Sequence, residues 1–167
     1  SIQNVPNTYV RGQGGLMGIA THPDFEENKF IYFTQSSSVE SEESGGNTAL
    51  YRAILQDNAL QDVTLLYKAK PNTKKGTHFG SRIVFDNDGY LYFTIGDRGK
   101  RDENPQDLSR DGGKVYRLME NGDIPTDNPF VDVKDAKNAV FSYGHRNPQG
   151  MTKHPITGEI WTHEHGP

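Results

Sequence analysis

Short apolar segments recur in pairs along the chain, and each pair is joined by a turn rich in proline, aspartate, asparagine or glycine. The pattern occurs three times, at residues 15–34, 81–94 and 149–162. In each copy the second segment is aromatic and ends in a threonine. Apolar segments of this length on either side of a tight turn are typical of β-hairpins. The pattern therefore predicts three copies of a hairpin unit.

The spacing of the copies predicts more than one hairpin in each unit. Their closing threonines, Thr34, Thr94 and Thr162, recur roughly every 60 to 70 residues, which is longer than common short blade repeats. Further strands are predicted between the copies, at residues 49–55, 63–69, 114–118 and 140–143. Each unit then holds about four strands, and four-stranded units repeated around an axis form a β-propeller.

We therefore expect an all-β protein, a β-propeller of four-stranded blades with about three blades in this chain. Propellers usually need about four to eight blades to close a ring, so residues 1–167 are expected to form part of a single propeller domain. No helix of useful length is predicted, and residues 102–109 form a turn or two at most. Two polar segments, 35–47 and 121–137, are expected to be exposed loops.

Composition narrows the classes of function. The chain has 167 residues, of which 32% are hydrophobic and 24% charged, as in soluble globular proteins. Its net charge of -4 leaves no basic excess to neutralise a phosphate backbone, so nucleic acid is not an expected partner. No apolar run approaches the roughly 20 residues that cross a bilayer, and no membrane span is expected. Because the chain lacks cysteine, disulfides and thiolate metal sites are excluded.

His78 and Asp97 are the candidates for acid–base chemistry. His78 stands just before one predicted strand of the second hairpin, and Asp97 stands just after the other. In an antiparallel pair these positions lie at the same end, so the two side chains can touch. A carboxylate that accepts from one imidazole nitrogen leaves the other nitrogen free as a general base. The alternative is structural, with His78 packed over Phe79 and Asp97 capping a glycine-rich turn.

The segment 144–150 is a candidate ligand-binding loop. It holds His145, Arg146 and Asn147 between two glycines and a proline. A guanidinium on a stiff turn suits a planar anionic ligand, since its fixed donors match a carboxylate edge. The alternative is a hairpin corner in which Arg146 only binds neighbouring carbonyls. In the glycine-rich segment 12–15, Gln13 is placed to present an amide to a flat ligand.

The segment 163–167 offers two interpretations as a metal site. Strand alternation would put His163 and His165 on one face, as zinc ligation requires, but the spacing places no third ligand. Alternatively, the turn at Gly166 and Pro167 exposes successive carbonyl oxygens, which hard cations such as calcium accept. The aspartate-rich segments at 86–89 and 123–128 lack the acidic residue of an EF-hand and are expected to be turns.

Several separated motifs together resemble one family. These are residues 12–18, His78 with 82–85, 92–97, 113–118, 144–150 and 164–167. In this order they are similar to the soluble pyrroloquinoline quinone (PQQ)-dependent aldose sugar dehydrogenases of the glucose/sorbosone dehydrogenase family. The resemblance implies a six-bladed propeller with the quinone lying flat over one end of the central channel. This chain would supply its N-terminal half.

The resemblance also implies roles for individual residues. His78 matches the general base that takes the proton from the anomeric hydroxyl, and it also faces the cofactor, while Asp97 matches its partner carboxylate. Arg146 matches a residue near the reactive dione. Other matches to cofactor-binding positions are Gln13, Asn147 and His165, and the carbonyls of Gly166 and Pro167 match calcium ligands. The chain departs from the glucose enzymes at Thr77, Ser81 and His165, which makes an aldose a more secure substrate class than glucose.

The leading hypothesis is an oxidoreductase that converts an aldose into its lactone with bound PQQ and calcium and passes electrons to an external acceptor. The family implies a periplasmic or secreted location. A noncatalytic propeller recognition module is the alternative, and a calcium-dependent lactonase is a third possibility. The joint presence of His78, Asp97 and Arg146 favours the enzyme, because a recognition module needs none of them.

Overall fold

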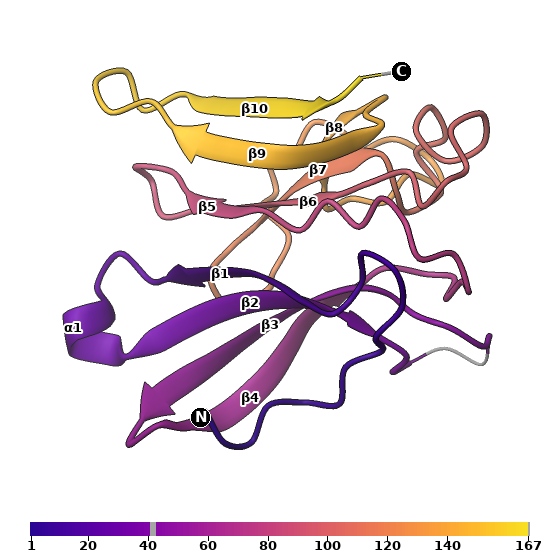
Figure 1. Cartoon of the computed structure of the whole chain (residues 1–167). Coiled ribbons are helices and arrows are strands. Elements are labelled where there is room, and N and C mark those ends of the chain that lie inside the picture. The colour runs from indigo at the N-terminus through magenta and orange to yellow at the C-terminus, as the bar shows by residue number, and fades with distance from the viewer. Residues whose placement is uncertain (41–42, 167) are drawn as a thin grey trace.

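The computed structural model describes residues 1–40 and 43–166, which form three antiparallel sheets stacked face to face (Figure 1). The first sheet has the strand order β1-β2-β3-β4, the second β5-β6-β7-β8, and the third pairs β9 with β10. The first strand of each sheet contacts the first strand of the next sheet: β1 contacts β5, and β5 contacts β9. The all-β propeller arrangement is thus confirmed, with two complete blades and two strands of a third in place of three complete blades.

The strands follow the predicted hairpins closely. The first sheet contains β1 (Leu16–Thr21), β2 (Phe30–Ser37), β3 (Asn47–Gln56) and β4 (Ala59–Lys68). The second contains β5 (Ile83–Phe85), β6 (Leu91–Ile95), β7 (Lys114–Leu118) and β8 (Val140–Tyr143). The third contains β9 (Asn147–Lys153) and β10 (Ile160–His165). A single helical turn, α1 (Phe25–Asn28), lies between β1 and β2. None of the helices in the described ranges is long and apolar enough to cross a membrane.

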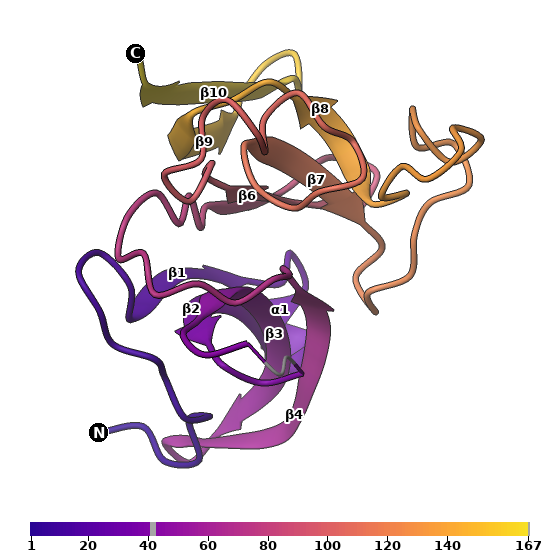
Figure 2. The same cartoon turned by 90° about the vertical axis from the view of Figure 1, so that its right-hand side faces the viewer.

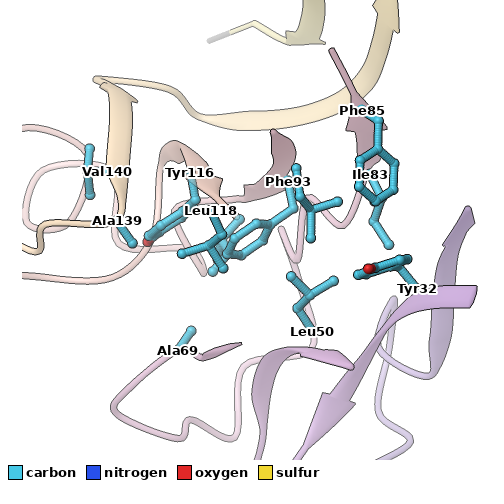
Figure 3. Close-up of a cluster of buried hydrophobic side chains, with 12 residues drawn as sticks. Tyr32, Leu50, Ala69, Ile83, Phe85, Phe93, Tyr116, Leu118, Ala139 and Val140 are labelled. Carbon is cyan, nitrogen blue, oxygen red and sulfur yellow. The ribbon is translucent and has the colours of Figure 1, made fainter. Parts of the chain in front are cut away.

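Both faces of the first sheet are apolar. Alternating residues of β2 separate into two buried clusters, with Tyr32 on one side and Ile31 and Phe33 on the other. The cluster that contains Tyr32 continues across the interface into the second sheet, where it includes Phe93 and Tyr116 (Figure 3). A sheet that packs on both faces loses the apolar–polar alternation of a half-exposed strand. Face-to-face stacking therefore explains why the strands read as continuous apolar runs.

The repeated threonines join one blade to the next. Thr34 Oγ1 in β2 accepts a hydrogen bond from Gly18 N and donates to the carbonyl of Ser81, at 2.9 Å in each case. In the second blade, Thr94 Oγ1 accepts from Arg82 N at 3.0 Å and donates to the carbonyl of Pro148 at 2.8 Å. The third threonine of the repeat, Thr162, lies at the matching place in β10. The repeat found in the sequence is thus a repeated interblade contact.

The expectation that two polar segments are fully exposed was wrong in part. Strand β2 extends to Ser37, and Gln35, Ser36 and Ser37 are all buried. The Gln35 amide donates to the carbonyl of Asn7 at 3.2 Å and accepts from Thr8 Oγ1 at 3.0 Å. The Ser36 hydroxyl donates to the carbonyl of Tyr9, so the N-terminal segment satisfies the side chains of Gln35 and Ser36, whereas the Ser37 hydroxyl pairs with that of Tyr51. Residues 41 and 42 of this loop lie outside the described residues.

In the second polar segment, Asn128 is only 3% exposed. Its amide nitrogen donates to the carbonyls of Arg117 and Asn138, and its Oδ1 accepts from Arg117 Nε at 2.6 Å. A buried polar side chain of this kind stabilises a fold when its donors and acceptors are all paired. Asn128 therefore ties the long connection between β7 and β8 (Figure 2) to β7 and to the residues that lead into β8.

Two buried tyrosines predict how stability depends on alkaline pH. Tyr67 and Tyr116 both donate to Asp111 Oδ1, at 2.6 and 2.9 Å, and burial raises the pKa of each well above 10. Since the folded-state pKa is the higher one, their contribution is fully present below the unfolded pKa, about 10, and is lost as pH rises above it. The midpoint of urea unfolding is expected to fall steeply above pH 10.

The variant Tyr116→Phe tests this dependence. It is expected to lose about 1 kcal/mol at pH 7, since a hydrogen bond is removed, and to show a shallower decline in stability above pH 10. Tyr143→Phe is the matched control, because the Tyr143 side chain is 43% exposed. An equally steep decline in Tyr116→Phe and in the control would contradict the assignment.

Candidate functional site

The second blade brings His78 and Asp97 together. In the hairpin of β5 and β6, Ile83 pairs with Phe93 and Phe85 with Leu91, so the residue before β5 meets the residue after β6. The Nδ1 of His78 lies 2.6 Å from Oδ1 of Asp97. The side chain of Asp97 is 1% exposed and that of His78 is 17% exposed. The contact expected from hairpin geometry is present.

This contact determines which ring nitrogen of His78 carries the hydrogen. The Asp97 carboxylate also accepts from Gly99 N at 2.6 Å, and as an ionised group it can only accept. The imidazole Nδ1 therefore carries the hydrogen, and Nε2 has a free lone pair. No protein partner binds Nε2 within residues 1–40 and 43–166. A neutral imidazole held in this tautomer is suited to accept a proton from a ligand.

The backbone at His78 is held in an uncommon conformation. Its φ is +54°, in the left-handed region that costs a residue with a side chain about 1–2 kcal/mol. The amide of His78 donates to Oε1 of Gln13 at 2.8 Å. Gln13, which the sequence predicts to bind a ligand, therefore also supports the histidine, and its amide nitrogen has no protein partner among the described residues.

The turn that carries Gln13 packs directly on the His78 segment. Gln13 N donates to the carbonyl of Gly76 at 2.7 Å. A Cβ at Gly12 would lie 2.3 Å from that same oxygen, and the φ of Gly12 is +59°. Only glycine allows this approach of two backbones. The glycine-rich segment thus brings the first and second blades together beside His78.

The start of β9 is tied to the segments that precede β5 and follow β6. The carbonyl of Arg146 accepts from Asp97 N at 2.7 Å, and Oδ1 of Asn147 accepts from Gly80 N at 3.2 Å. Asn147 is 1% exposed, whereas the Arg146 side chain is half-buried. Throughout the described ranges, no carboxylate forms an ion pair with Arg146. Its guanidinium is therefore available to an anionic ligand.

Glu164 holds the backbone at Arg146 and Asn147 in place. The sequence analysis assigned no role to Glu164. Its Oε2 accepts from the amides of Arg146 and Asn147, at 2.6 and 3.2 Å, and its Oε1 lies 3.4 Å from Nδ1 of His145. From the neighbouring strand β10, the Glu164 carboxylate thus binds the backbone of Arg146 and Asn147, the two residues that are candidates for binding a ligand. The signal was present in the sequence as an acidic residue beside His165, but its partners are backbone groups that no motif specifies.

The remaining predicted site residues lie at the end of β10. His165 is exposed and pairs in register with Asn147. Gly166 borders a cavity of about 230 Å³ together with Arg146 and Glu164, and Pro167 lies outside the described residues. A bulge between His163 and Glu164 interrupts the alternation on which a zinc site would depend. No group of three or more metal-binding side chains occurs in the part of the chain that the structure describes.

The charge around the site is unevenly distributed. Residues 1–23, 63–85 and 136–158 contain no aspartate or glutamate, although the chain has 22 acidic residues. These stretches contain Gln13, His78 and Arg146. Two carboxylates contact these residues. Asp97 binds the His78 imidazole, and Glu164 binds the backbone amide of Arg146. The stretches that supply Gln13, His78 and Arg146 thus add no negative charge of their own that would repel an anionic ligand.

A larger cavity is lined in part by Arg98. It has a volume of about 640 Å³, and its lining combines cations such as Lys137 and Arg110 with the carboxylate of Asp111. His78 does not line it. Because its charges are mixed and it lacks the histidine–aspartate pair, we place the candidate active site at His78.

Stacked antiparallel sheets define this protein as a β-propeller, and the histidine–aspartate pair beside their adjacent first strands is a candidate acid–base site. The chain belongs to the Glucose / Sorbosone dehydrogenase family, whose model matches residues 1–167. It is 36% identical over 167 residues to the aldose sugar dehydrogenase YliI of Escherichia coli, covering 99% of this chain and 44% of that protein.

Two further proteins extend the comparison. The quinoprotein glucose dehydrogenase B of Acinetobacter calcoaceticus is 31% identical over 179 residues, covering 93% of this chain and 36% of that protein. The PQQ-bound aldose sugar dehydrogenase of Streptomyces coelicolor superposes with a TM-score of 0.81 and 28% identity, covering 98% of this chain and 46% of that structure. The chain thus spans less than half the length of each of these three relatives.

Proposed function

We propose that this chain is the N-terminal half of a propeller domain that oxidises an aldose at its anomeric carbon to the lactone, with PQQ as the hydride acceptor. The observation that carries the proposal is the 2.6 Å contact between His78 Nδ1 and Asp97, which leaves Nε2 free. Similarity to aldose sugar dehydrogenases, one of them PQQ-bound, supports the substrate class and the cofactor.

In this mechanism the chain's own groups bind the sugar and move a proton. His78 Nε2 accepts the proton of the anomeric hydroxyl as the hydride leaves the anomeric carbon. Asp97 stabilises the imidazolium that forms and keeps the ring in the correct tautomer. PQQ, when bound, supplies the two-electron acceptor, and calcium would polarise its carbonyl. The reduced cofactor would need an external electron acceptor, and the family suggests a periplasmic or secreted setting.

The described residues fit such a cofactor. Among residues 1–40 and 43–166, no protein group binds the guanidinium of Arg146 or the amide nitrogens of Gln13 and Asn147, whose oxygens are engaged. His165 lies in the same strand pair, beside Asn147. Calcium would bind at the carbonyls of Gly166 and Pro167, and Gly166 lies on the cavity that Arg146 also borders. Oxygen donors of this kind suit a hard cation.

The proposal is tested on the full-length protein reconstituted with PQQ and calcium. We expect reduction of a redox dye with glucose, galactose or maltose, and none when either PQQ or calcium is withheld. A holoprotein that binds PQQ but turns over none of a panel of aldoses would refute the dehydrogenase. Hydrolysis of a lactone with calcium alone would indicate the lactonase, and absence of both activities would favour a recognition module.

A further inference from the structure

Arg98 is a fully buried cation next to Asp97 in the chain. It is 1% exposed, and no carboxylate forms an ion pair with it within the described ranges. Burial lowers the pKa of its guanidinium to about 10. Burying a charge without a counterion is costly, so other interactions must stabilise it. Nothing in the proposed mechanism yet uses this residue.

The guanidinium binds the backbone that leads into His78. It donates to the carbonyl of Thr77, which directly precedes His78, and to the carbonyl of Lys75 at 2.7 Å. Weaker contacts reach Gly46 O at 3.3 Å and Thr73 Oγ1 at 3.4 Å. Three of these four acceptors belong to residues 73–77. Arg98 therefore holds the backbone immediately before His78 in place through hydrogen bonds.

The same guanidinium contacts the residue that follows His78. Its Cζ lies 3.5 Å from the centroid of the Phe79 ring, in a stacked cation–π contact. Phe79 is 2% exposed and packs against Gly14, where a Cβ would lie 2.6 Å from the ring. Arg98 thus holds both chain neighbours of His78. Arg98 also directly follows Asp97 in the chain. The residue that holds the backbone around His78 is therefore covalently linked to the residue that binds its imidazole.

We propose that Arg98 is a positioning residue, which fixes the backbone on both sides of His78 so that the imidazole stays on Asp97 and presents Nε2 to the ligand. This inference rests on the proposed role of His78 as the base. It assigns Arg98 no contact with sugar or cofactor. Lysine is not equivalent, because its ammonium could donate to carbonyls but has no planar group to lie over the Phe79 ring at the same time.

The test compares Arg98→Lys and Arg98→Met with wild type in the full-length holoprotein. Arg110→Met is the matched control, since Arg110 is 47% exposed and pairs with the surface carboxylates of Glu103 and Asp107. We expect kcat for the aldose to fall about 10- to 100-fold in Arg98→Lys with KM changed less than about threefold, and both constants to stay near wild type in the control. Unchanged kcat in a folded Arg98→Lys variant would overturn the proposal.

Hydrogen exchange on the cofactor-free protein gives a second measurement that does not depend on turnover. Amides of residues 74–80 are expected to exchange at least tenfold faster in Arg98→Lys, whereas β6 and β7 keep wild-type protection. Equal acceleration throughout the blade would show a general structural role and would refute specific positioning. If wild type oxidises no aldose and the local acceleration still occurs, the proposed function fails while the positioning of His78 stands.

Discussion

Replacing His78 by glutamine is expected to lower kcat for aldose oxidation about 10³-fold, within the range of about 10²–10⁴ that general-base catalysis supplies. Glutamine keeps a polar side chain of similar length, but its amide cannot accept a proton from the anomeric hydroxyl. The measurement is steady-state dye reduction by the full-length protein at saturating PQQ, calcium and sugar. A separate titration with PQQ shows whether the variant still binds the cofactor.

The matched control for this prediction is His154→Gln. His154 also stands before a turn, but its Nδ1 accepts from the amide of Thr157 at 3.0 Å and so serves the β9–β10 hairpin. Its replacement is expected to leave kcat within about twofold of wild type, because a surface substitution changes little. If His78→Gln kept more than a tenth of wild-type kcat while His154→Gln behaved as expected, another group would have to be the base.

Replacing Asp97 by asparagine is expected to lower kcat about 10²–10⁴-fold, as in other enzymes whose carboxylate orients a catalytic histidine. The neutral amide cannot stabilise the imidazolium, and it can hold the ring in the wrong tautomer. The backbone of Asp97 keeps its bonds, because its N donates to the Arg146 carbonyl and its O accepts from the Asn104 side chain. The urea midpoint, measured alongside kcat, separates loss of catalysis from loss of folding.

Asp107→Asn provides the comparison for this second variant. Asp107 is 43% exposed and binds Ser109 in a surface turn, where its pKa is lowered mainly by that hydrogen bond. Its replacement is expected to change neither kcat nor the midpoint appreciably. The assignment of Asp97 fails if Asp97→Asn folds normally and turns over at a rate similar to Asp107→Asn.

The fold was largely predictable from the sequence because its elements are local. The predicted strands at 114–118 and 140–143 coincide with β7 and β8, since short apolar runs between turn residues specify a strand directly. The contact of His78 with Asp97 was predictable for a related reason, because hairpin ends must meet. The chain's membership of the family also followed from separated motifs in the right order.

The supporting residues were not predictable, because their partners are backbone groups from distant segments. Arg98 binds carbonyls of residues 73–77, and Glu164 binds the amides of Arg146 and Asn147. Residue type and spacing do not specify such contacts. The same applies to Gln35, whose partners lie in the N-terminal segment. The roles of the site residues in catalysis and in binding cofactor or metal stay predictions.

The threonine contacts between blades have a consequence for ligand binding. Thr34 binds the carbonyl of Ser81, three residues after His78, and Thr94 binds that of Pro148, two residues after Arg146. Separation of neighbouring blades would therefore displace both the His78 segment and the Arg146 segment, which we propose to bind the cofactor. A cofactor that binds only the closed arrangement must raise the temperature at which the blades come apart, by mass action. Thermal denaturation in the presence of increasing cofactor thus reports on the integrity of the ring as well as on occupancy.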